Sequence, residues 1–228
     1  MESEGILYVI ATPIGNLEDI TLRALKTLNE VEVIFCEDTR VFLRILDHYG
    51  IKGKKLERYD EHVESIKIPE IVKLIKEGKK LALVTNAGTP TISDPGYRLV
   101  RKLREEGLKV IPIPGPSALI TAISVSGLPT DSFVFYGFLP RKEGKRKKLM
   151  ESWIEEERTI IFYESPERVK RTLLELKSFE KLADRFIFIA REMTKFFEEY
   201  IFTSLGSLNL DSIKEKGEFV LILEGKHE

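Results

Sequence analysis

Short apolar runs alternate with amphipathic stretches along the first half of the chain. The apolar runs occupy residues 7–11, 31–36, 81–84 and 109–113, and apolar side chains recur at helical spacing in 19–28, 41–50, 65–76 and 95–106. Parallel strands are buried on both faces and are therefore short continuous apolar runs, joined by helices. The pattern predicts an α/β domain with a mostly parallel sheet over residues 1–113. Because proline fits only the first turn of a helix, Pro69 is an alternative start for the third helix.

The pattern changes from residue 114 onward. Strand-like runs occupy 133–136, 158–163, 185–190, 197–203 and 219–223, and helical patterns occupy 119–125, 144–157, 167–177 and 207–214. Several of these strands follow one another without a long crossover, which favours antiparallel pairing. We therefore predict a second α/β domain with a mixed sheet over residues 114–228.

Composition narrows the class of protein. The chain has 228 residues, 43% of them hydrophobic, and a formal net charge of −1, so no overall positive field attracts nucleic acid. Its single cysteine, Cys36, excludes an intrachain disulfide and favours the cytosol. The N-terminus is acidic where a signal peptide is basic, and no apolar run approaches the length of a membrane span. A soluble cytoplasmic protein is expected.

The stretch from Leu83 to Gly96 is rich in small residues and contains two glycines and two prolines. Asp94-Pro95 is typical of a helix cap and first turn, but that explains only its last residues. The loops at 12–16, 86–93 and 114–118 each follow a predicted parallel strand. Since the carboxyl ends of parallel strands meet at one edge of a sheet, these loops are expected to form a single ligand pocket.

Known phosphate cradles and metal motifs are absent from the sequence. The first strand is followed by only one glycine, Gly15, and there is no P-loop, no Gly-x-Ser-x-Gly and no metal-binding spacing of His and Cys. These absences favour a nucleoside ligand without a phosphate tail, and chemistry without metal or covalent intermediate.

Three charged segments allow a structural and a functional interpretation. Glu37-Asp-Thr-Arg40 and Arg191-Glu-Met-Thr-Lys195 each follow a predicted strand, where a helix cap or a surface salt bridge is as plausible as a catalytic role. The third segment follows Phe138-Leu139-Pro140, and its six basic residues suit either a solvated helix start or nucleic acid. Those residues are Arg141, Lys142, Lys145, Arg146, Lys147 and Lys148.

Several of these motifs, in this order, resemble the ribosomal RNA small subunit methyltransferase I family, within the tetrapyrrole-methylase-like class of S-adenosylmethionine methyltransferases. The similarity runs from about residue 7 to 225. The matching segments are Thr12–Thr21, Glu37–Arg40, Asn86–Gly96, Pro114–Ala118, Tyr136–Pro140, Phe162–Ser165, Arg191–Lys195 and Lys216–Glu218. Two departures stand out: Asn86 occupies a position that is usually aspartate, and many relatives extend further at the C-terminus, so RNA affinity is expected to depend more on the basic run.

The resemblance implies two α/β domains with S-adenosylmethionine in the cleft between them, a homodimer, and methylation of a cytidine ribose 2′-hydroxyl in 16S rRNA, free or in the 30S particle. Glu37 or Asp38 would accept or orient the hydroxyl, Arg40 would hold a phosphate, and Glu192 with Lys195 is the second candidate pair. The implied cofactor residues are Pro13, Ile14, Gly15, Asn86, Ala87, Gly88, Thr89, Pro90, Ile92, Ser117, Ala118 and Gly217.

Two other functions remain open from the sequence. One is a small-molecule tetrapyrrole methylase of the same fold, which would have no use for the basic run. The other is a non-catalytic RNA-binding protein of ribosome assembly, towards which Asn86 is a weak hint.

Overall fold

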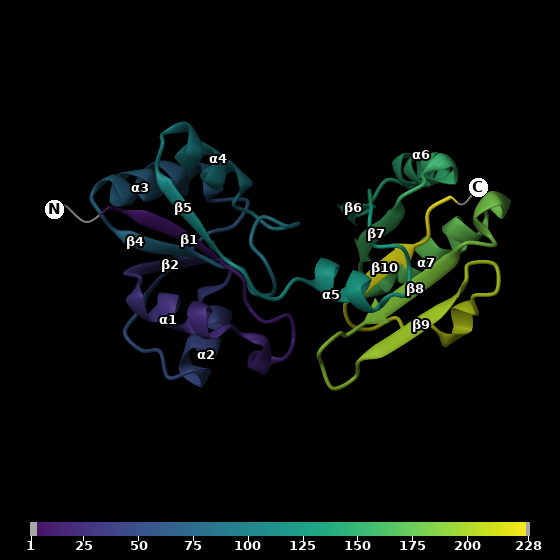
Figure 1. The fold of residues 1–228 in the computed structure, drawn as a ribbon, viewed down its shortest axis with the longest axis horizontal. Coiled ribbons are helices and arrows are strands. Elements are labelled where there is room, and N and C mark those ends of the chain that lie inside the picture. Colours follow the sequence, from purple (N-terminus) through teal and green to yellow (C-terminus); the bar gives the residue numbers. More distant parts are fainter. Residues whose placement is uncertain (1–3, 227–228) are drawn as a thin grey trace. The chain divides into compact units, whose positions relative to one another are not determined.

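The computed structural model describes residues 4–226 and divides into two compact units, one ending at Ser117 and the other beginning at Ala118 (Figure 1). Each unit has its own β-sheet and its own buried hydrophobic clusters. The division falls between the last strand of the first sheet and the first helix of the second unit.

The N-terminal unit contains, within the described residues, a five-stranded sheet in the order β3-β2-β4-β1-β5. All neighbouring strands in it are parallel, as predicted. The strands are β1 (Ile6–Ile10), β2 (Val33–Cys36), β3 (Lys55–Arg58), β4 (Lys80–Leu83) and β5 (Lys109–Ile113). Four of them match the predicted strands.

The sequence pattern missed β3, because its residues Lys55-Leu-Glu-Arg58 are mostly charged. It lies at the edge of the sheet, where one side of a strand faces solvent and charge is tolerated. Glu57 there receives ion pairs from Lys55 and Lys67, at 2.5 and 2.6 Å.

Helices cover both faces of this sheet. In Figure 1, α1 (Leu22–Glu30) and α2 (Thr39–His48) lie on one face, and α3 (Glu64–Lys76) and α4 (Tyr97–Glu105) lie on the other. A short 3₁₀ turn, η1 (Leu17–Asp19), precedes α1. Buried side chains form a separate cluster on each face, so the strands are apolar on both sides.

The alternative start of α3 at Pro69 is wrong, because the helix begins at Glu64 and Pro69 lies inside it. Proline at this position removes one helical hydrogen bond. The buried residues Ile71, Val72 and Ile75 follow it on the helix, and their packing outweighs that loss.

The C-terminal unit contains, among residues up to 226, a second five-stranded sheet in the order β6-β7-β10-β8-β9. β6 and β7 are parallel and the other pairs are antiparallel, which confirms the predicted mixed sheet. The strands are β6 (Phe133–Phe138), β7 (Thr159–Glu164), β8 (Phe186–Arg191), β9 (Glu199–Ser204) and β10 (Phe219–Leu223).

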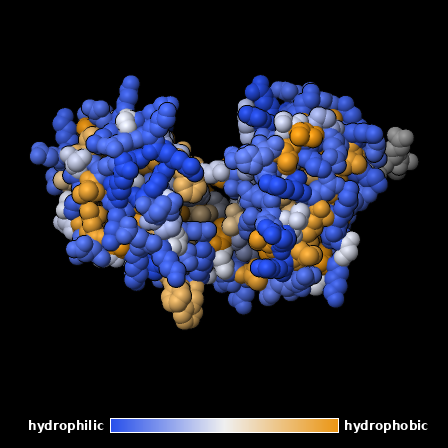
Figure 2. Space-filling view, turned by 180° about the vertical axis from the view of Figure 1, so that it is seen from behind, coloured by the Kyte–Doolittle hydropathy of each residue, from blue (hydrophilic) through white to orange (hydrophobic). Residues whose placement is uncertain are grey.

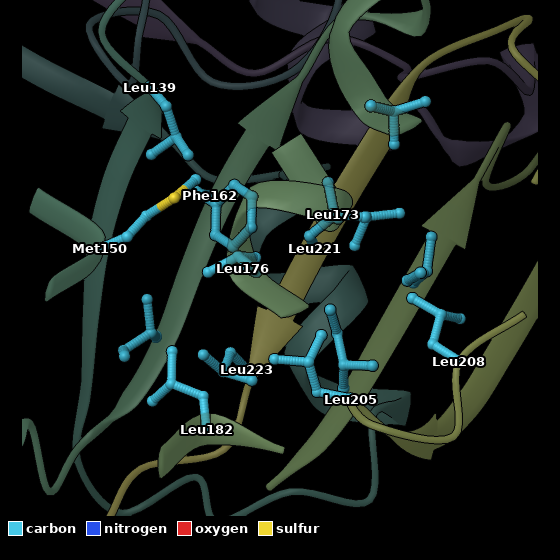
Figure 3. Close-up of a cluster of buried hydrophobic side chains, with 14 of the residues drawn as sticks. Leu139, Met150, Phe162, Leu173, Leu176, Leu182, Leu205, Leu208, Leu221 and Leu223 are labelled. Atoms are coloured by element: carbon cyan, nitrogen blue, oxygen red, sulfur yellow. The ribbon is translucent and has the colours of Figure 1, made fainter. Parts of the chain in front are cut away.

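Helices on the two faces of this sheet differ in extent. α5 (Ala118–Val125) packs on one face, while α6 (Glu143–Ser152) and α7 (Pro166–Lys177) contribute to the cluster on the other. Figure 3 shows that second cluster, where Met150 of α6 and Leu173 of α7 meet Phe162 of β7. Short 3₁₀ turns complete the unit: η2 (Trp153–Glu155), η3 (Glu180–Leu182) and η4 (Leu210–Ser212).

Two helices of this unit are shorter than predicted. The predicted helix at 144–157 ends at Ser152 and continues only as the turn η2. The predicted helix at 207–214 is wrong, since only η4 forms there. Leu208 and Ile213 are both buried against the sheet on either side of that turn, a spacing that a continuous helix does not provide.

No helix among residues 4–226 is long and apolar enough to cross a membrane, and no three His, Cys, Asp or Glu side chains in that range gather as metal ligands.

Candidate active site

Four connections lie along one edge of the N-terminal sheet. They follow β1, β2, β4 and β5, which are neighbours in the order β2-β4-β1-β5 and all run in the same direction. The three small-residue loops at 12–16, 86–93 and 114–118 therefore meet at the carboxyl edge, as the sequence predicted, and Glu37–Arg40 lies on the same edge.

Hydrogen bonds join the three small-residue loops into one frame. The amide of Thr12 donates to the carbonyl of Gly88 at 2.9 Å, and the amide of Gly88 donates back to Thr12 at 3.0 Å. The buried hydroxyl of Thr12 donates to the carbonyl of Thr85, and that of Thr89 donates to Pro116, both at 3.0 Å. The edge is therefore held in place by threonine side chains in addition to the backbone.

Close backbone approach explains the small residues of this frame. Gly88 has a φ of +91°, which favours glycine. A Cβ on Gly115 would stand 3.1 Å from the Cβ of Ala11. Thr91 and Ser93 also have positive φ values, of 75° and 63°, so the loop after β4 holds strain that its hydrogen bonds must offset.

The predicted cofactor residues do not all lie in this frame. Most of them belong to its loops, where Pro13, Ile14, Gly88 and Pro90 are buried and Gly15, Ala87 and Ile92 are exposed. Ala118 is the first residue of α5 in the C-terminal unit, and Gly217 also belongs to that unit, before β10.

Asn86 presents an open acceptor at the head of the loop after β4. Its side-chain oxygen Oδ1 is buried and has no hydrogen-bond partner among the described residues. Its backbone amide lies 3.5 Å from Oε2 of Glu37. A buried acceptor left unpaired costs about 1–3 kcal/mol, a cost that a ligand carrying an N–H group would remove.

Two carboxylates flank the hydroxyl of Thr85 on this edge. Thr85 is buried, and its Oγ1 donates to Oε2 of Glu37 at 3.2 Å. Burial, together with the negative charge of Glu37, raises the pKa of Asp94 to about 6, against the opposing effect of a hydrogen bond with Thr85. One hydroxyl has a single proton to donate, so Thr85 satisfies one carboxylate at a time.

Asp94 is not among the predicted site residues, because Asp-Pro before a helix is typical of a cap. That prediction is wrong: α4 begins at Tyr97, its cap residue is Gly96, and no side chain caps it. Glu64 instead accepts the amide of Gly96 at 3.0 Å and the hydroxyl of Tyr59 at 2.9 Å. The end of the loop is therefore fixed from α3, which leaves Asp94 at the edge.

Asp38 forms the helix cap that was the structural alternative for its segment. Its Oδ1 accepts the backbone amides of Arg40 and Val41 at 2.8 and 3.4 Å, and its Oδ2 pairs with Nη2 of Arg40 at 3.0 Å. The hydrogen bonds with Arg40 lower the pKa of Asp38 to about 2. Because these contacts occupy both oxygens, we no longer assign proton acceptance to Asp38, whereas the exposed Arg40 side chain is accessible to a phosphate.

A second charged cluster lies in the C-terminal unit, between the end of β8 and the start of β10. Nζ of Lys195 lies 2.8 Å from both Oε1 of Glu192 and Oε2 of Glu218. Burial alone would lower the pKa of Lys195, but the two carboxylates outweigh it and the pKa is raised. Lys195 therefore stays protonated at neutral pH and can stabilise negative charge but cannot accept a proton.

Glu192 is held in a strained turn. Its φ is 52°, and a Cβ on Gly217 would stand 2.5 Å from its Cγ, so only glycine allows this contact. Burial works to raise the pKa of Glu192, while Lys195 and the amide of Glu218 outweigh it and keep the pKa below its usual value. The predicted pair of Glu192 and Lys195 therefore forms a contact, and Gly217 lies against it.

The basic run divides into exposed and buried members. Arg146 is only 2% exposed, and its Nε and Nη2 lie 2.7 and 2.5 Å from the carboxylate of Glu175. Its Nη1 donates to the carbonyls of Pro140 and Arg141, so its donors are used inside the protein and it is not an RNA contact. The other predicted members are exposed, as is Phe138 beside them: Arg141, Lys142, Lys145, Lys147 and Lys148.

Comparison with known proteins agrees with this architecture. Residues 6–209 match the family of Tetrapyrrole (Corrin/Porphyrin) Methylases. A ribosomal RNA small subunit methyltransferase I from Thermotoga maritima is 48% identical over 97% of this chain and 99% of its own length. Its counterpart from Haemophilus influenzae is 47% identical over 97% of this chain and 79% of its own.

Two solved structures share the fold at low sequence identity. The methyltransferase CobJ aligns with a TM-score of 0.71 at 18% identity, covering 98% of this chain and 95% of its own. Uroporphyrin-III-C-methyltransferase from Thermus thermophilus aligns with a TM-score of 0.61 at 20% identity, covering 97% and 93%. These likenesses show the tetrapyrrole methylase fold for both units of the chain.

Proposed function

Because the chain belongs to the ribosomal RNA small subunit methyltransferase I family of tetrapyrrole methylases, we propose that it methylates the ribose 2′-hydroxyl of a cytidine in 16S rRNA. The methyl donor of this methyltransferase is S-adenosylmethionine. The observation that carries the proposal is the 48% identity with a relative over nearly the whole of both chains.

The carboxyl edge of the N-terminal sheet fits the donor. When bound, S-adenosylmethionine supplies a methyl group already activated on a sulfonium. Asn86 offers an unpaired acceptor to an amino group of the donor, and Gly88 and Gly115 allow the close backbone packing that brings the three loops together. Neither a phosphate cradle nor a metal ligand set is required, in agreement with the sequence.

A carboxylate is proposed to accept the proton of the substrate hydroxyl. A ribose hydroxyl is a weak nucleophile, so a base that takes its proton as the oxygen–methyl bond forms and the sulfur–methyl bond breaks would raise the rate. Glu37 and Asp94 are the candidate bases at the carboxyl edge of the N-terminal sheet. The hydroxyl of Thr85 lies between them and can donate its hydrogen bond to either carboxylate. Glu192 is the candidate in the C-terminal unit.

Cations complete the proposed catalytic groups. Lys195 keeps its charge and suits stabilisation of the developing negative oxygen. Arg40 is exposed and held by Asp38, which pre-orients it for a phosphate next to the target nucleotide.

RNA is proposed to lie on the exposed part of the basic run. Its five exposed cations suit phosphates, and the ring of Phe138 beside them suits a base. We further propose that the protein acts as a homodimer in the cytoplasm, where its ribosomal substrate is found.

Incubation with labelled S-adenosylmethionine and either naked 16S rRNA or assembled 30S particles tests the function. Nuclease digestion and mass spectrometry should then find the label in 2′-O-methylcytidine, and the better of the two substrates identifies the natural form. Label on an added tetrapyrrole but not on RNA would refute the proposal in favour of a small-molecule methylase. Retention of RNA without any transfer would refute it in favour of a non-catalytic assembly protein.

A further inference from the structure

A buried carboxylate supports the loop after β4 from outside that loop. Figure 2 shows hydrophilic side chains over most of the visible surface, whereas Glu64, in the first turn of α3, is buried. Its Oε1 accepts both the hydroxyl of Tyr59 at 2.9 Å and the amide of Gly96 at 3.0 Å. Its Oε2 lies 3.8 Å from Nε of Arg98 in α4. Glutamate is rarely buried without partners, so these contacts explain why it is tolerated here.

The position of Glu64 is itself fixed by its surroundings. Asp60, in the turn before α3, accepts the backbone amides of the two residues before Glu64 at 2.9 and 3.2 Å. The amide of Glu64 donates to the carbonyl of Asp60 at 2.9 Å. Tyr59 is buried, and its ring packs edge-on against Phe35 of β2. The carboxylate therefore has a rigid support on the side away from the loop.

The two halves of the loop after β4 are held in different ways. The first half is tied to the loops after β1 and β5 by the hydrogen bonds of Thr12 and Thr89. In the second half, Thr91 and Ser93 have positive φ values, which cost energy in residues other than glycine. A strained segment keeps its conformation only where its ends are held. Glu64 supplies such a hold where the second half ends.

Gly96 transmits this hold to the rest of the loop. Its φ is +124°, and a Cβ there would stand 2.7 Å from Cδ2 of Leu83 and 3.1 Å from Cγ2 of Thr91. The end of the loop therefore packs back against β4 and against its own middle. A shift of Gly96 away from Glu64 would move Thr91 and Asp94 with it, because Asp94 is only two residues away.

Stability of the unit alone does not require a carboxylate at position 64. An apolar side chain of similar size would avoid the cost of burying a charge. It would, however, leave the amide of Gly96 without an acceptor and the end of the loop without its hold. Asn86 and Gly88, which are proposed to hold the donor, belong to the same loop. The carboxylate therefore serves the conformation of that loop.

We infer that Glu64 is a positioning residue of the donor site. By accepting the amide of Gly96, it keeps the loop after β4 in the conformation that binds S-adenosylmethionine, without being a donor contact itself. The inference rests on the donor site proposed above. It does not depend on which acceptor the enzyme methylates.

Titration calorimetry of the full chain with S-adenosylmethionine, in the absence of RNA, tests the inference. Glu64→Ala removes the acceptor of the Gly96 amide and is expected to raise the dissociation constant of the donor about tenfold or more. Glu64→Gln keeps an oxygen that can accept this amide, so its dissociation constant is expected to stay within about threefold of the wild type. Far-UV circular dichroism checks the fold of each variant. If Glu64→Ala does not fold, Glu64→Met takes its place, because methionine fills a similar volume without an acceptor.

Glu57→Ala is the matched control. The side chain of Glu57 on β3 is 12% exposed, against 9% for Glu64, and it pairs with Lys67 of α3 at 2.6 Å. The same substitution thus removes a carboxylate contact of the same helix, away from Gly96, and donor affinity is expected to equal that of the wild type. Hydrogen–deuterium exchange without donor gives a second readout. The Gly96 amide should exchange faster in Glu64→Ala than in the wild type or in Glu57→Ala.

Weaker donor binding by Glu64→Ala, with near wild-type binding by Glu64→Gln and Glu57→Ala, would support the inference. Wild-type affinity in Glu64→Ala would overturn it. An equal loss in Glu57→Ala would also overturn it, because general destabilisation of the unit would then explain both results. So would an equal loss in Glu64→Gln, which still carries the acceptor oxygen. If the affinities follow the expectation but the wild type methylates no RNA, the proposed function is wrong and the inference stands.

Discussion

Replacing Arg146 should test whether the basic run has one role or two. Arg146 is buried on α6, and both oxygens of Glu175 accept from its guanidinium. Arg146→Ala leaves Glu175 nearly buried with only Arg171, whose Nε lies 3.1 Å away. Removing one partner of a buried ion pair costs about 3–5 kcal/mol, and the remaining partner favours the lower value, about 3 kcal/mol. Lys145→Ala, on the same helix but exposed, should change stability by less than about 0.5 kcal/mol.

The assay is urea unfolding followed by tryptophan fluorescence. Trp153 is the single tryptophan of the chain and is buried in the same unit as Arg146, so its signal reports on that unit. The midpoint should fall strongly for Arg146→Ala with little change in slope. In filter binding to 16S rRNA, Lys145→Ala should weaken retention. If Arg146→Ala costs less than about 1 kcal/mol, or no more than Lys145→Ala, the reasoning from burial fails.

Three further outcomes are expected. Arg40→Ala should lower the rate of methyl transfer roughly tenfold, because it removes one phosphate contact. The affinity for the donor, measured by calorimetry, should not change. An unchanged rate would show that Arg40 does not belong to the site. Ala118→Trp should weaken donor binding in calorimetry, and wild-type affinity would exclude the start of α5 from the donor site. The pKa of Asp94 is raised to about 6, so its contribution to stability is present below pH 4 and lost as the pH rises through 6. Asp94→Asn should therefore unfold at a higher temperature than the wild type at pH 8 but not at pH 4, measured by calorimetry, and parallel pH profiles would contradict this.

The fold followed from the sequence wherever burial determined the pattern. The runs at 7–11 and 109–113 are recognisable because strands with two covered faces must be apolar throughout. β3 was not predicted from the sequence, because an edge strand tolerates the charges of Lys55 and Glu57. These two side chains form an ion pair with each other. The helix predicted at 207–214 does not form, because Leu208 and Ile213 are both buried against the sheet and their spacing does not fit one face of a helix.

The sequence predicted where the loops of the candidate site meet, but it did not predict which partner each charged side chain has. Loops after parallel strands had to meet at one edge, so the contacts of Thr85 with Thr12 and of Thr89 with Pro116 were predictable from topology. Roles depend on which oxygen faces which donor, and side-chain direction is not encoded in spacing. Asp94 was predicted to cap a helix, but it lies near the carboxylate of Glu37. Arg146 was predicted to be a surface cation, but its side chain is buried.

The asparagine at position 86 can be understood from its neighbours. Its amide faces Glu37, and the charge of Glu37 already helps to raise the pKa of Asp94. An aspartate at 86 would add a third negative charge to this edge of the sheet, and like charges repel more strongly at partly buried positions than in bulk water. Asparagine keeps the acceptor oxygen without that charge. Recognition of a donor amino group at this position therefore depends on a hydrogen bond to a neutral oxygen, without a formal charge on the protein side.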